Sequence, residues 1–366
     1  MPAGNALVLL LPGLGDALAA GPILRGLARS AWAIDVMTWQ RPVSEYVREL
    51  GAVRDITELP LQPGPAEILR QIMRLRRSGY DLCILPFPAT RWQYALVARG
   101  VGAKRLAMHE YGGASSFIAR TARSTRIALR GGHRIAENLR LARSLGLQSG
   151  EGDLEYWIPS TWRSSRIAGM LGIHPGSMAY KGNEAKRWPY ERFVALTRAQ
   201  ALGGRTVRFF LGPHEQTEAA RAEQDFRGIQ GIEIVRKPLA EAAQRLAECE
   251  VFVGNDAGFS HLASGLGVKT LALFGMTSEV RGVPIGPTVA LRPSLCPACH
   301  DEGSRGFECV RRLEYRCILR DMDYDVVIRQ VEQLFAMTSI EQRLSLEGPF
   351  RLYGRAHETA HEVPSA

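Results

Sequence analysis

The chain has 366 residues. This length exceeds the usual size of a domain with a single hydrophobic core, which predicts two domains of ordinary size. Apolar residues make up 46% and charged residues 23% of the sequence, a mixture typical of a globular protein and not of a disordered chain. The sequence contains no apolar run of about 18 residues, so we expect no membrane-spanning helix. The apolar opening is interpreted as a strand, loop and helix and not as a signal peptide, because Asp16 interrupts it and no basic residue precedes Arg25.

The formal net charge of +9 is unevenly distributed. Between Arg70 and Arg143 there are fifteen Lys or Arg residues against three acids. Any one of these arginines could simply lie on a solvated helix face. For the whole stretch we favour an anionic partner, either a phosphate-rich acceptor or an anionic membrane surface.

Short β-branched or leucine-rich runs alternate with helical periodicity along the chain, which predicts an α/β protein with mainly parallel sheets. In the first half, helices are expected at residues 21–30 and 66–79, and strands at residues 6–12, 33–39, 81–87 and 104–109. In the second half, strands are expected at residues 169–175, 206–212, 232–237, 251–255, 269–275 and 288–293.

A helix-like stretch at residues 133–147 is followed by a polar segment that contains Gly, Ser and Pro, which is typical of a linker. We therefore expect the domain boundary near residues 150–168. The predicted division is residues 1–160 for the N-terminal domain, residues 161–340 for the C-terminal domain, and residues 341–366 for a polar, mobile tail.

The first candidate site follows the first predicted strand, where Gly13, Gly15 and Asp16 precede a helix. Glycines let a ligand approach the backbone closely, and the carboxyl ends of strands are where ligands bind in such sheets. Asp16 could be a catalytic carboxylate or, as is structurally commoner, a helix N-cap.

The second candidate site is a polar loop after the strand at residues 169–175. It offers Ser177, Lys181 and Lys186, together with backbone N–H groups that could hold a diphosphate. Solvated surface lysines are the alternative interpretation.

The third candidate site follows the strand at residues 251–255. Asp256, Gly258 and His261 lead into a helix of small residues, which lets the helix N-terminus approach a phosphate group. Thr277 follows the next strand, so two loops are expected to converge on a nucleotide site. The alternative is a structural one, with Asp256 as the N-cap of the helix.

Four late cysteines form the last candidate cluster: Cys296, Cys299, Cys309 and Cys317. The two residues between the first pair match a metal knuckle, in which neighbouring thiolates reach one tetrahedral ion. Structural zinc or iron, reduced thiols and disulfides all stay open, although disulfides are disfavoured without a secretion signal.

These segments resemble glycosyltransferase family 9, the ADP-heptose:lipopolysaccharide heptosyltransferases. The resemblance rests on GLGDALAAGPIL, HRIAENLRLARSLG, HPGSMAYKGNEAKRWP and NDAGFSHLASGLGVKTLALFG, in that order, and spans roughly residues 6–335. The late cysteines also resemble a cluster found in part of the family. The resemblance implies a GT-B fold, in which two Rossmann-like domains with mainly parallel sheets face a central cleft.

The same resemblance implies an inverting transfer of heptose from ADP-heptose to the lipopolysaccharide inner core, without a cofactor or a catalytic metal. The enzyme would work in the cytoplasm, with peripheral contact to the inner face of the cytoplasmic membrane. By position, Asp16 would be the general base and Lys186 would stabilise the leaving diphosphate. The expected donor-binding residues are Gly15, Ser177, Asp256, Gly258, His261 and Thr277.

The sequence also departs from the family pattern. Ala257 stands where many relatives have Ser or Thr, Met276 replaces a frequent Pro, and PGLG precedes Asp16 in place of polar or basic residues. A protein acceptor or another nucleotide sugar therefore stays open. A Rossmann oxidoreductase is disfavoured because the glycine fingerprint is incomplete, and a nucleic-acid-binding metal module does not explain two α/β halves. We expect no nucleic-acid partner.

Overall fold

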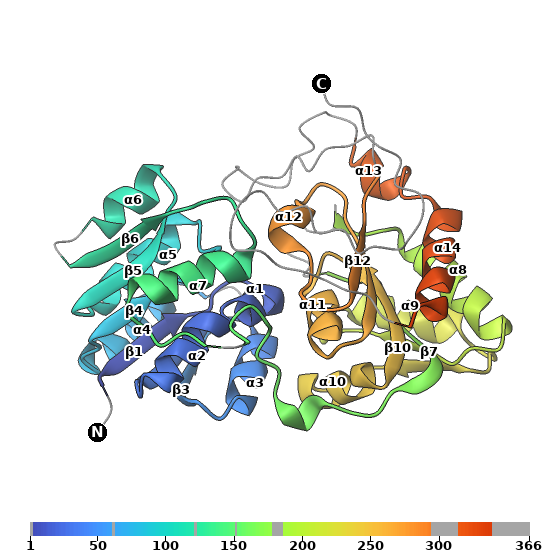
Figure 1. Ribbon diagram of the computed structural model, residues 1–366, viewed down its shortest axis with the longest axis horizontal. Helices are drawn as coiled ribbons and strands as arrows, with labels where there is room; N and C mark the ends of the chain where they lie inside the picture. The colour runs from blue at the N-terminus through green and yellow to red at the C-terminus, as the bar shows by residue number, and fades with distance from the viewer. Residues whose placement is uncertain are drawn as a thin grey trace.

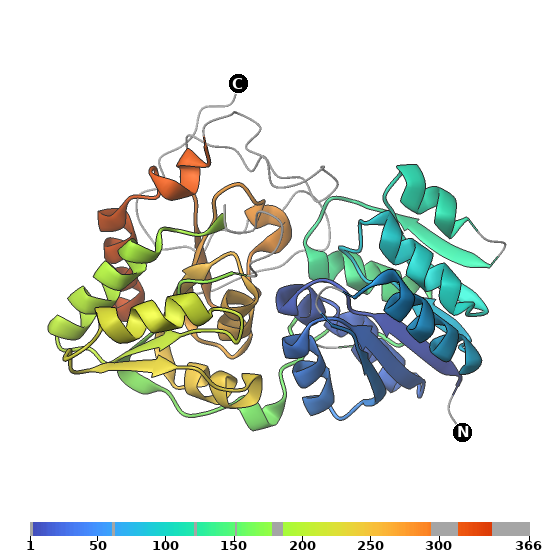
Figure 2. The same cartoon turned by 180° about the vertical axis from the view of Figure 1, so that it is seen from behind.

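The computed structural model describes residues 3–60, 63–120, 123–150, 152–177, 186–293 and 314–338. Within these ranges the chain forms two six-stranded sheets with helices packed on them. The two halves lie side by side, as Figures 1 and 2 show from opposite sides, and we call them the N-lobe and the C-lobe. Over the same ranges, no helix combines the length and the hydropathy needed to cross a bilayer.

The N-lobe sheet is parallel throughout, with the strand order β3-β2-β1-β4-β5-β6. Val8 of the central strand pairs with Val36 on one side and Ile84 on the other. The strands are β1 (Asn5–Leu9), β2 (Ala33–Thr38), β3 (Val53–Glu58), β4 (Leu82–Ile84), β5 (Arg105–Glu110) and β6 (Ser124–Ala128).

Helices cover both faces of this sheet, because successive side chains of a strand point to opposite faces. Ala6 and Val8 pack in one hydrophobic cluster with α2, α3 and α7, whereas Leu7 and Leu9 pack in another with α4 and α5. The helices are α1 (Leu14–Ala19), α2 (Gly21–Arg29), α3 (Arg41–Glu49), α4 (Pro65–Arg77), α5 (Trp92–Val101), α6 (Gly113–Ala119) and α7 (Arg134–Ser144).

The C-lobe sheet repeats this architecture with the parallel order β12-β11-β10-β7-β8-β9. Its strands are β7 (Ile167–His174), β8 (Val207–Phe210), β9 (Ile232–Val235), β10 (Cys249–Asn255), β11 (Lys269–Leu273) and β12 (Thr288–Leu291). Its helices are α8 (Tyr190–Leu202), α9 (Gln216–Asp225), α10 (Leu239–Ala247), α11 (Gly258–Gly265), α12 (Glu279–Gly282), α13 (Arg316–Leu319) and α14 (Tyr324–Ala336), with a short 3₁₀ turn at Ser160–Trp162.

The expected α/β class and the parallel sheets are confirmed, and each strand expected from the sequence is present. Two further strands, β3 and β6, had not been predicted. Both are edge strands of the N-lobe sheet, and most of their side chains are exposed or half-buried. An edge strand does not need a long apolar run, so its sequence gives a weak signal.

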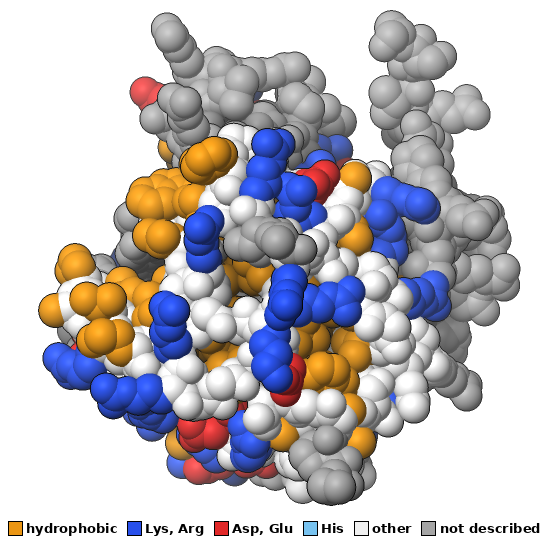
Figure 3. Space-filling model, turned by 90° about the vertical axis from the view of Figure 1, so that its left-hand side faces the viewer, with side chains coloured by type: hydrophobic (Ala, Val, Ile, Leu, Met, Phe, Trp, Pro, Cys, Tyr) orange, Lys and Arg blue, Asp and Glu red, His pale blue; other side chains and the backbone are white. Residues whose placement is uncertain are grey.

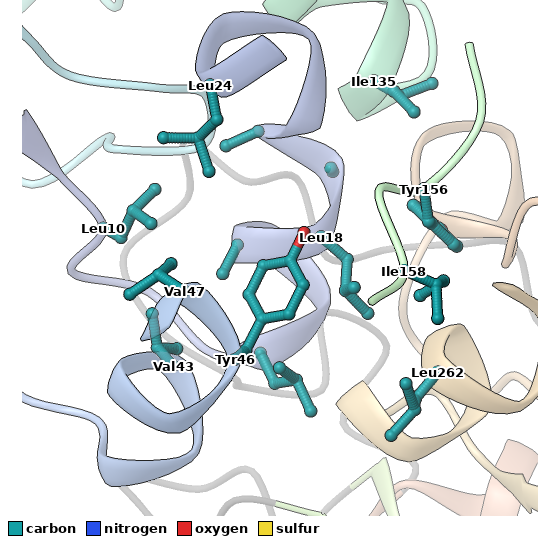
Figure 4. Packing of buried hydrophobic residues seen from close by; sticks show 14 of the residues in the cluster. Leu10, Leu18, Leu24, Val43, Tyr46, Val47, Ile135, Tyr156, Ile158 and Leu262 are labelled. Carbon is teal, nitrogen blue, oxygen red and sulfur yellow. The ribbon is translucent and has the colours of Figure 1, made fainter. Parts of the chain in front are cut away.

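A single hydrophobic cluster continues from one lobe into the other. Figure 4 shows Tyr156 and Ile158, from the segment that connects the lobes, beside Leu18 of the N-lobe and above Leu262 of the C-lobe, all in this cluster. The Tyr46 hydroxyl also donates to the Trp157 carbonyl oxygen at 2.9 Å. The lobes are therefore joined by packed apolar side chains as well as by the chain itself.

The chain crosses from one lobe to the other between α7 and β7. We propose that the domains divide there, at residues 1–160 and 161–340. The tail at residues 341–366 lies outside the described residues.

Candidate functional site

The N-terminal ends of α1 and α11 meet where the two lobes join. Each helix follows the carboxyl end of a central strand, β1 in the N-lobe and β10 in the C-lobe. A Cβ atom placed on Gly15 would lie 2.6 Å from His261 Cδ2, and one placed on Gly258 would lie 2.9 Å from Leu14 Cβ. Only glycine allows this approach at either position. Two candidate sites that are far apart in the sequence thus become one.

Asp16 pairs with Arg134, the first residue of α7. Arg134 Nη1 lies 2.9 Å from Asp16 Oδ1, and the two side chains are only 13% and 19% exposed. The N-cap of α1 is Gly13, whereas Asp16 lies in the first helical turn. The interpretation of Asp16 as a helix N-cap is therefore wrong, because its carboxylate is held by an arginine from another helix.

Asp256 forms a second ion pair on the opposite side of the junction. Lys186 Nζ lies 3.3 Å from Asp256 Oδ2. Burial alone would raise the pKa of Asp256, but the charges of Lys186 and Arg134 outweigh burial and lower that pKa to about 2. The N-cap of α11 is Ala257, so the alternative role of Asp256 as N-cap is also wrong.

Arg134 lies close to both carboxylates. A Cβ atom placed on Gly282 of α12 would lie 3.4 Å from Arg134 Nη2 and 3.9 Å from Asp256 Oδ1. Arg134 of the N-lobe thus lies near the acidic residue of the C-lobe, and its charge helps to lower the pKa of Asp256. A neighbouring contact also joins the two lobes here, because His133 Nε2 lies 2.8 Å from the Val283 carbonyl oxygen.

His261 is buried and neutral. Burial lowers its pKa to about 3. Its Nδ1 lies 2.6 Å from the Tyr156 hydroxyl, which itself accepts a hydrogen bond from the Ile285 N–H at 3.2 Å. We assign the Tyr156 hydroxyl as the donor and His261 Nδ1 as the acceptor of this hydrogen bond. The proton of the neutral ring is then on Nε2. Because Nε2 faces Gly15, His261 presents a hydrogen-bond donor to the start of α1.

Asn255 positions the segment that carries Lys186. Its Oδ1 accepts from the Trp188 N–H at 2.8 Å, and its Nδ2 donates to the Pro175 carbonyl oxygen at 2.7 Å. One buried amide thus fixes the chain on both sides of residues 178–185, which include Lys181 and lie outside the described residues. Ser177 Oγ accepts from Arg187 Nε at 3.2 Å.

The structure therefore gathers most of the residues predicted from the sequence. Gly15, Asp16, Gly258 and His261 meet at the lobe junction, and Lys186 lies against Asp256. Thr277 is buried after β11 and helps to lower the pKa of Asp256. Ser177 contacts Arg187, the residue that follows Lys186 in the sequence. The catalytic and donor-binding roles of all these residues stay predictions.

The predicted metal cluster lies outside this description. Cys296, Cys299 and Cys309 are beyond the described residues, and so is the side chain of Cys317. Over the ranges that are described, no three His, Cys, Asp or Glu side chains gather in a group that could hold a metal ion.

Two residues of the site were not predicted from the sequence. Arg134 belongs to the HRIAENLRLARSLG segment, which was noted for its family resemblance but not for any chemical role. Tyr156 belongs to the predicted linker, whose composition signals flexibility and gives no sign of a contact with His261.

Comparisons with known proteins identify the family and the fold. Residues 68–299 match the profile of glycosyltransferase family 9 (heptosyltransferase). Lipopolysaccharide heptosyltransferase 3 of Escherichia coli is 22% identical over 282 residues, which cover 73% of this chain and 82% of that protein.

Solved structures share the fold at lower identity. E. coli heptosyltransferase WaaC with ADP-2-deoxy-2-fluoro heptose superposes with a TM-score of 0.67 and 18% identity, over 90% of this chain and 99% of that one. The dodecameric iron-containing heptosyltransferase TibC in complex with ADP-D-beta-D-heptose gives a TM-score of 0.53 and 13% identity, over 90% and 76% of the two chains. The expected GT-B fold is thereby confirmed. The chain belongs to glycosyltransferase family 9, the heptosyltransferase family, and is a glycosyltransferase.

Proposed function

We propose that the protein transfers heptose from ADP-heptose to the inner core of lipopolysaccharide, with inversion at the anomeric carbon and without a catalytic metal. The observation that carries this proposal is that α1, which holds Asp16, packs closely against α11, which follows the Lys186–Asp256 pair of the C-lobe. A base and a cation on opposite sides of a junction are what a direct displacement requires. The E. coli relative and the WaaC complex support the choice of acceptor and donor.

Asp16 would act as the general base. Its carboxylate would take the proton of the acceptor hydroxyl while that oxygen forms a bond to the anomeric carbon. In the same step the bond from that carbon to the diphosphate breaks, and ADP leaves with the electron pair. Arg134 would hold the carboxylate in one orientation by its 2.9 Å contact.

Lys186 would stabilise the negative charge that develops on the leaving diphosphate. Its 3.3 Å contact with Asp256 places the ammonium group at the C-lobe side of the junction before the donor binds. Asp256, which stays ionised, would then orient Lys186 and accept hydrogen bonds from the donor. His261 would donate from Nε2, and Gly15, Gly258, Ser177 and Thr277 would complete the donor site.

In this step Arg134 and Lys186 would take the place of a metal ion, because each would bring a positive charge to the leaving diphosphate. For the late cysteines we keep the proposal of a structural zinc or iron ion, which the spacing of Cys296 and Cys299 supports. TibC, an iron-containing heptosyltransferase, makes iron a reasonable choice. Elemental analysis of protein purified without chelators tests it, and well under one metal ion per chain would exclude it.

The acceptor is proposed to be an anionic glycolipid at the cytoplasmic face of the inner membrane, which suits the basic N-lobe. A protein acceptor and another nucleotide sugar are the second candidates, because Ala257 and Met276 alter the pattern around the donor site.

The decisive assay mixes the protein with ADP-heptose and a lipopolysaccharide precursor that lacks heptose, and follows both products by mass spectrometry. We expect one heptose per acceptor, one ADP per transfer and full activity with EDTA present. NMR of the new linkage should show the anomeric configuration opposite to that of the donor. Donor hydrolysis without transfer would reject this acceptor. Loss of turnover in EDTA, from protein whose metal content and circular dichroism stay unchanged, would reject the metal-free mechanism.

Calorimetric titration with ADP and ADP-heptose tests the donor site separately. Lys186→Ala should weaken donor binding at least about tenfold through loss of a charge-assisted contact. Lys269→Ala is the matched control, because Lys269 is similarly buried and pairs with Glu250 at 2.9 Å outside the site. Equal donor affinity in the two variants would remove Lys186 from the donor site.

A further inference from the structure

Large apolar side chains are exposed on three adjacent helices of the N-lobe, α4, α5 and α6. Among the described residues, eight large hydrophobic side chains are exposed, and five of them lie on these helices. They are between 46% and 75% exposed: Leu69, Met73, Trp92, Leu96 and Phe117. Single exposed apolar residues are ordinary on a protein surface, but five on neighbouring helices mark a surface for interaction.

The three helices form one continuous layer. Ile72 of α4 lies against Gly100 of α5, 2.9 Å from the position of a Cβ atom there. Arg99 of α5 donates from Nη1 to the Ile118 carbonyl oxygen of α6 at 3.1 Å. Figure 2 shows the three helices side by side on the N-lobe. Figure 3, which views the molecule from the N-lobe end, shows hydrophobic and basic side chains interspersed on the left of the view.

The same layer is strongly basic. The three helices contain one acidic residue, Glu67, and five arginines, and a sixth arginine, Arg91, immediately precedes α5. The arginines within the helices are Arg70, Arg74, Arg76, Arg77 and Arg99. Arg70 keeps 70% of its side chain exposed although it contacts Glu67. We call the five apolar residues and these six arginines the α4–α6 surface.

The three helices of the α4–α6 surface begin at the edge of the sheet that carries Asp16. In parallel strand–helix units, each helix begins at the carboxyl edge of the sheet, and α1 begins at the same edge as α4, α5 and α6. Trp92 begins α5, Leu69, Leu96 and Phe117 lie in the second turn of their helices, and Met73 lies in the third turn of α4. A partner bound by the apolar side chains near these helix starts would therefore lie beside the edge at which α1, with Asp16 in its first turn, begins.

We infer that the α4–α6 surface docks on an anionic phospholipid bilayer, with the apolar side chains entering the headgroup region and the arginines contacting lipid phosphates. Interspersed arginines and large apolar side chains are the combination that binds such interfaces. A nucleic acid would use the charge but not the exposed leucines. A second copy of the chain would bring six arginines against six arginines, which is unfavourable.

Co-sedimentation with vesicles tests the inference on the full chain, with no sugar donor present, so its result is independent of the transferase assay. We expect binding to vesicles of phosphatidylcholine with phosphatidylglycerol, weakened by salt, and at least about tenfold weaker binding to phosphatidylcholine alone. Equal binding to both vesicles, or binding to neither, would overturn the inference.

Two pairs of variants locate the contact. Leu69→Ser combined with Leu96→Ser, and Arg70→Gln combined with Arg77→Gln, should each lower the partition coefficient at least about tenfold. The matched controls are Leu202→Ser on α8, where the leucine is 80% exposed, and Arg163→Gln combined with Arg227→Gln. The controls should bind like the wild type.

Circular dichroism establishes that each variant is folded before binding is compared. An equal loss of binding in the controls and in the α4–α6 variants would show that the surface is not the contact. Sedimentation of the protein without vesicles tests the alternative that a second copy of the chain binds this surface. A dimer that Leu69→Ser with Leu96→Ser converts to monomer would mean that the surface joins two copies, and the lipid inference would be wrong.

Discussion

Arg134 Nη1 contacts Asp16 Oδ1 at 2.9 Å, although the two residues are 118 positions apart in the sequence. The arginine begins α7 and the aspartate lies in the first turn of α1, so the ion pair fixes one helix against the other. The same guanidinium helps to lower the pKa of Asp256 in the C-lobe. One cation therefore serves both halves of the proposed site.

Arg134→Gln should lower turnover at least about tenfold, because in the proposed mechanism Arg134 orients Asp16 and adds positive charge near the leaving diphosphate. Steady-state kinetics of heptose transfer measure the effect. Arg143→Gln, a change to an exposed arginine of the same helix, is the control and should leave turnover unchanged. Wild-type kinetics for Arg134→Gln would show that the Arg134–Asp16 ion pair has no role in transfer.

Gly15→Ala should impair both stability and transfer. The new methyl group would lie 2.6 Å from His261 Cδ2, so the ring or α1 must move, at a cost of about 1–3 kcal/mol in the free energy of unfolding. Urea denaturation and turnover are measured together. In Gly64→Ala, the control, the added Cβ meets no atom within 4 Å, so little change is expected. If Gly15→Ala behaved like its control, the close contact between α1 and α11 would be refuted.

Tyr156→Phe should reduce transfer by disturbing the orientation of His261. Without the hydroxyl, Nδ1 and the Ile285 N–H lose their buried partner, which costs about 1–3 kcal/mol of stability. We expect kcat/KM for the donor to fall about tenfold or more. Tyr190→Phe removes a comparable hydrogen bond, to Asp225 at 3.1 Å, away from the site and should keep full activity. Equal kinetics in both variants would exclude a positioning role for Tyr156.

Stability should fall as the pH is lowered from 7 to 5, because two buried histidines stay neutral in the folded state. Burial lowers the pKa of His261 to about 3 and that of His133 to about 4, below the usual value of 6.5. Below pH 6.5 the unfolded state therefore binds more protons than the folded state, so acid favours unfolding. Each histidine contributes up to about 1.4 kcal/mol per pH unit in this window. Over the same window Asp256, with a pKa of about 2, stays ionised and adds no pH dependence.

Chemical denaturation at pH 7, 6 and 5 measures this dependence. In His133→Gln the free energy of unfolding should depend less steeply on pH than in the wild type. Unfolding of the variant should take up about one proton fewer at most, since one of the two neutral histidines is removed. A free energy of unfolding that did not change between pH 7 and pH 5 would contradict neutral burial of both rings.

The sequence predicts those parts of the fold and site that local patterns encode. Glycines after strands located Gly15 and Gly258, and the ordered segments led to the family. It did not predict the edge strands β3 and β6, whose sequences VRDITE and STRIA are largely polar, whereas the edge strands β9 (IEIV) and β12 (TVAL) are more apolar and were predicted. It also left N-cap positions open for Asp16 and Asp256, because the pattern of a polar residue before a helix does not reveal which residue starts the helix.

Arg134 and Tyr156 could not be identified from the sequence for a different reason. Their partners lie on elements more than 100 residues away, and only the packed lobes bring them together. Local periodicity carries no information about such contacts, whereas the three-dimensional arrangement gives them directly.

The turnover of Asp16→Asn at saturating ADP-heptose is the most direct test of the proposed site. The amide keeps the size of the side chain but cannot accept the acceptor proton, so we expect turnover to fall at least about a hundredfold while donor affinity stays near the wild-type value. Near-normal turnover in a folded variant would contradict the assignment of Asp16 as the base.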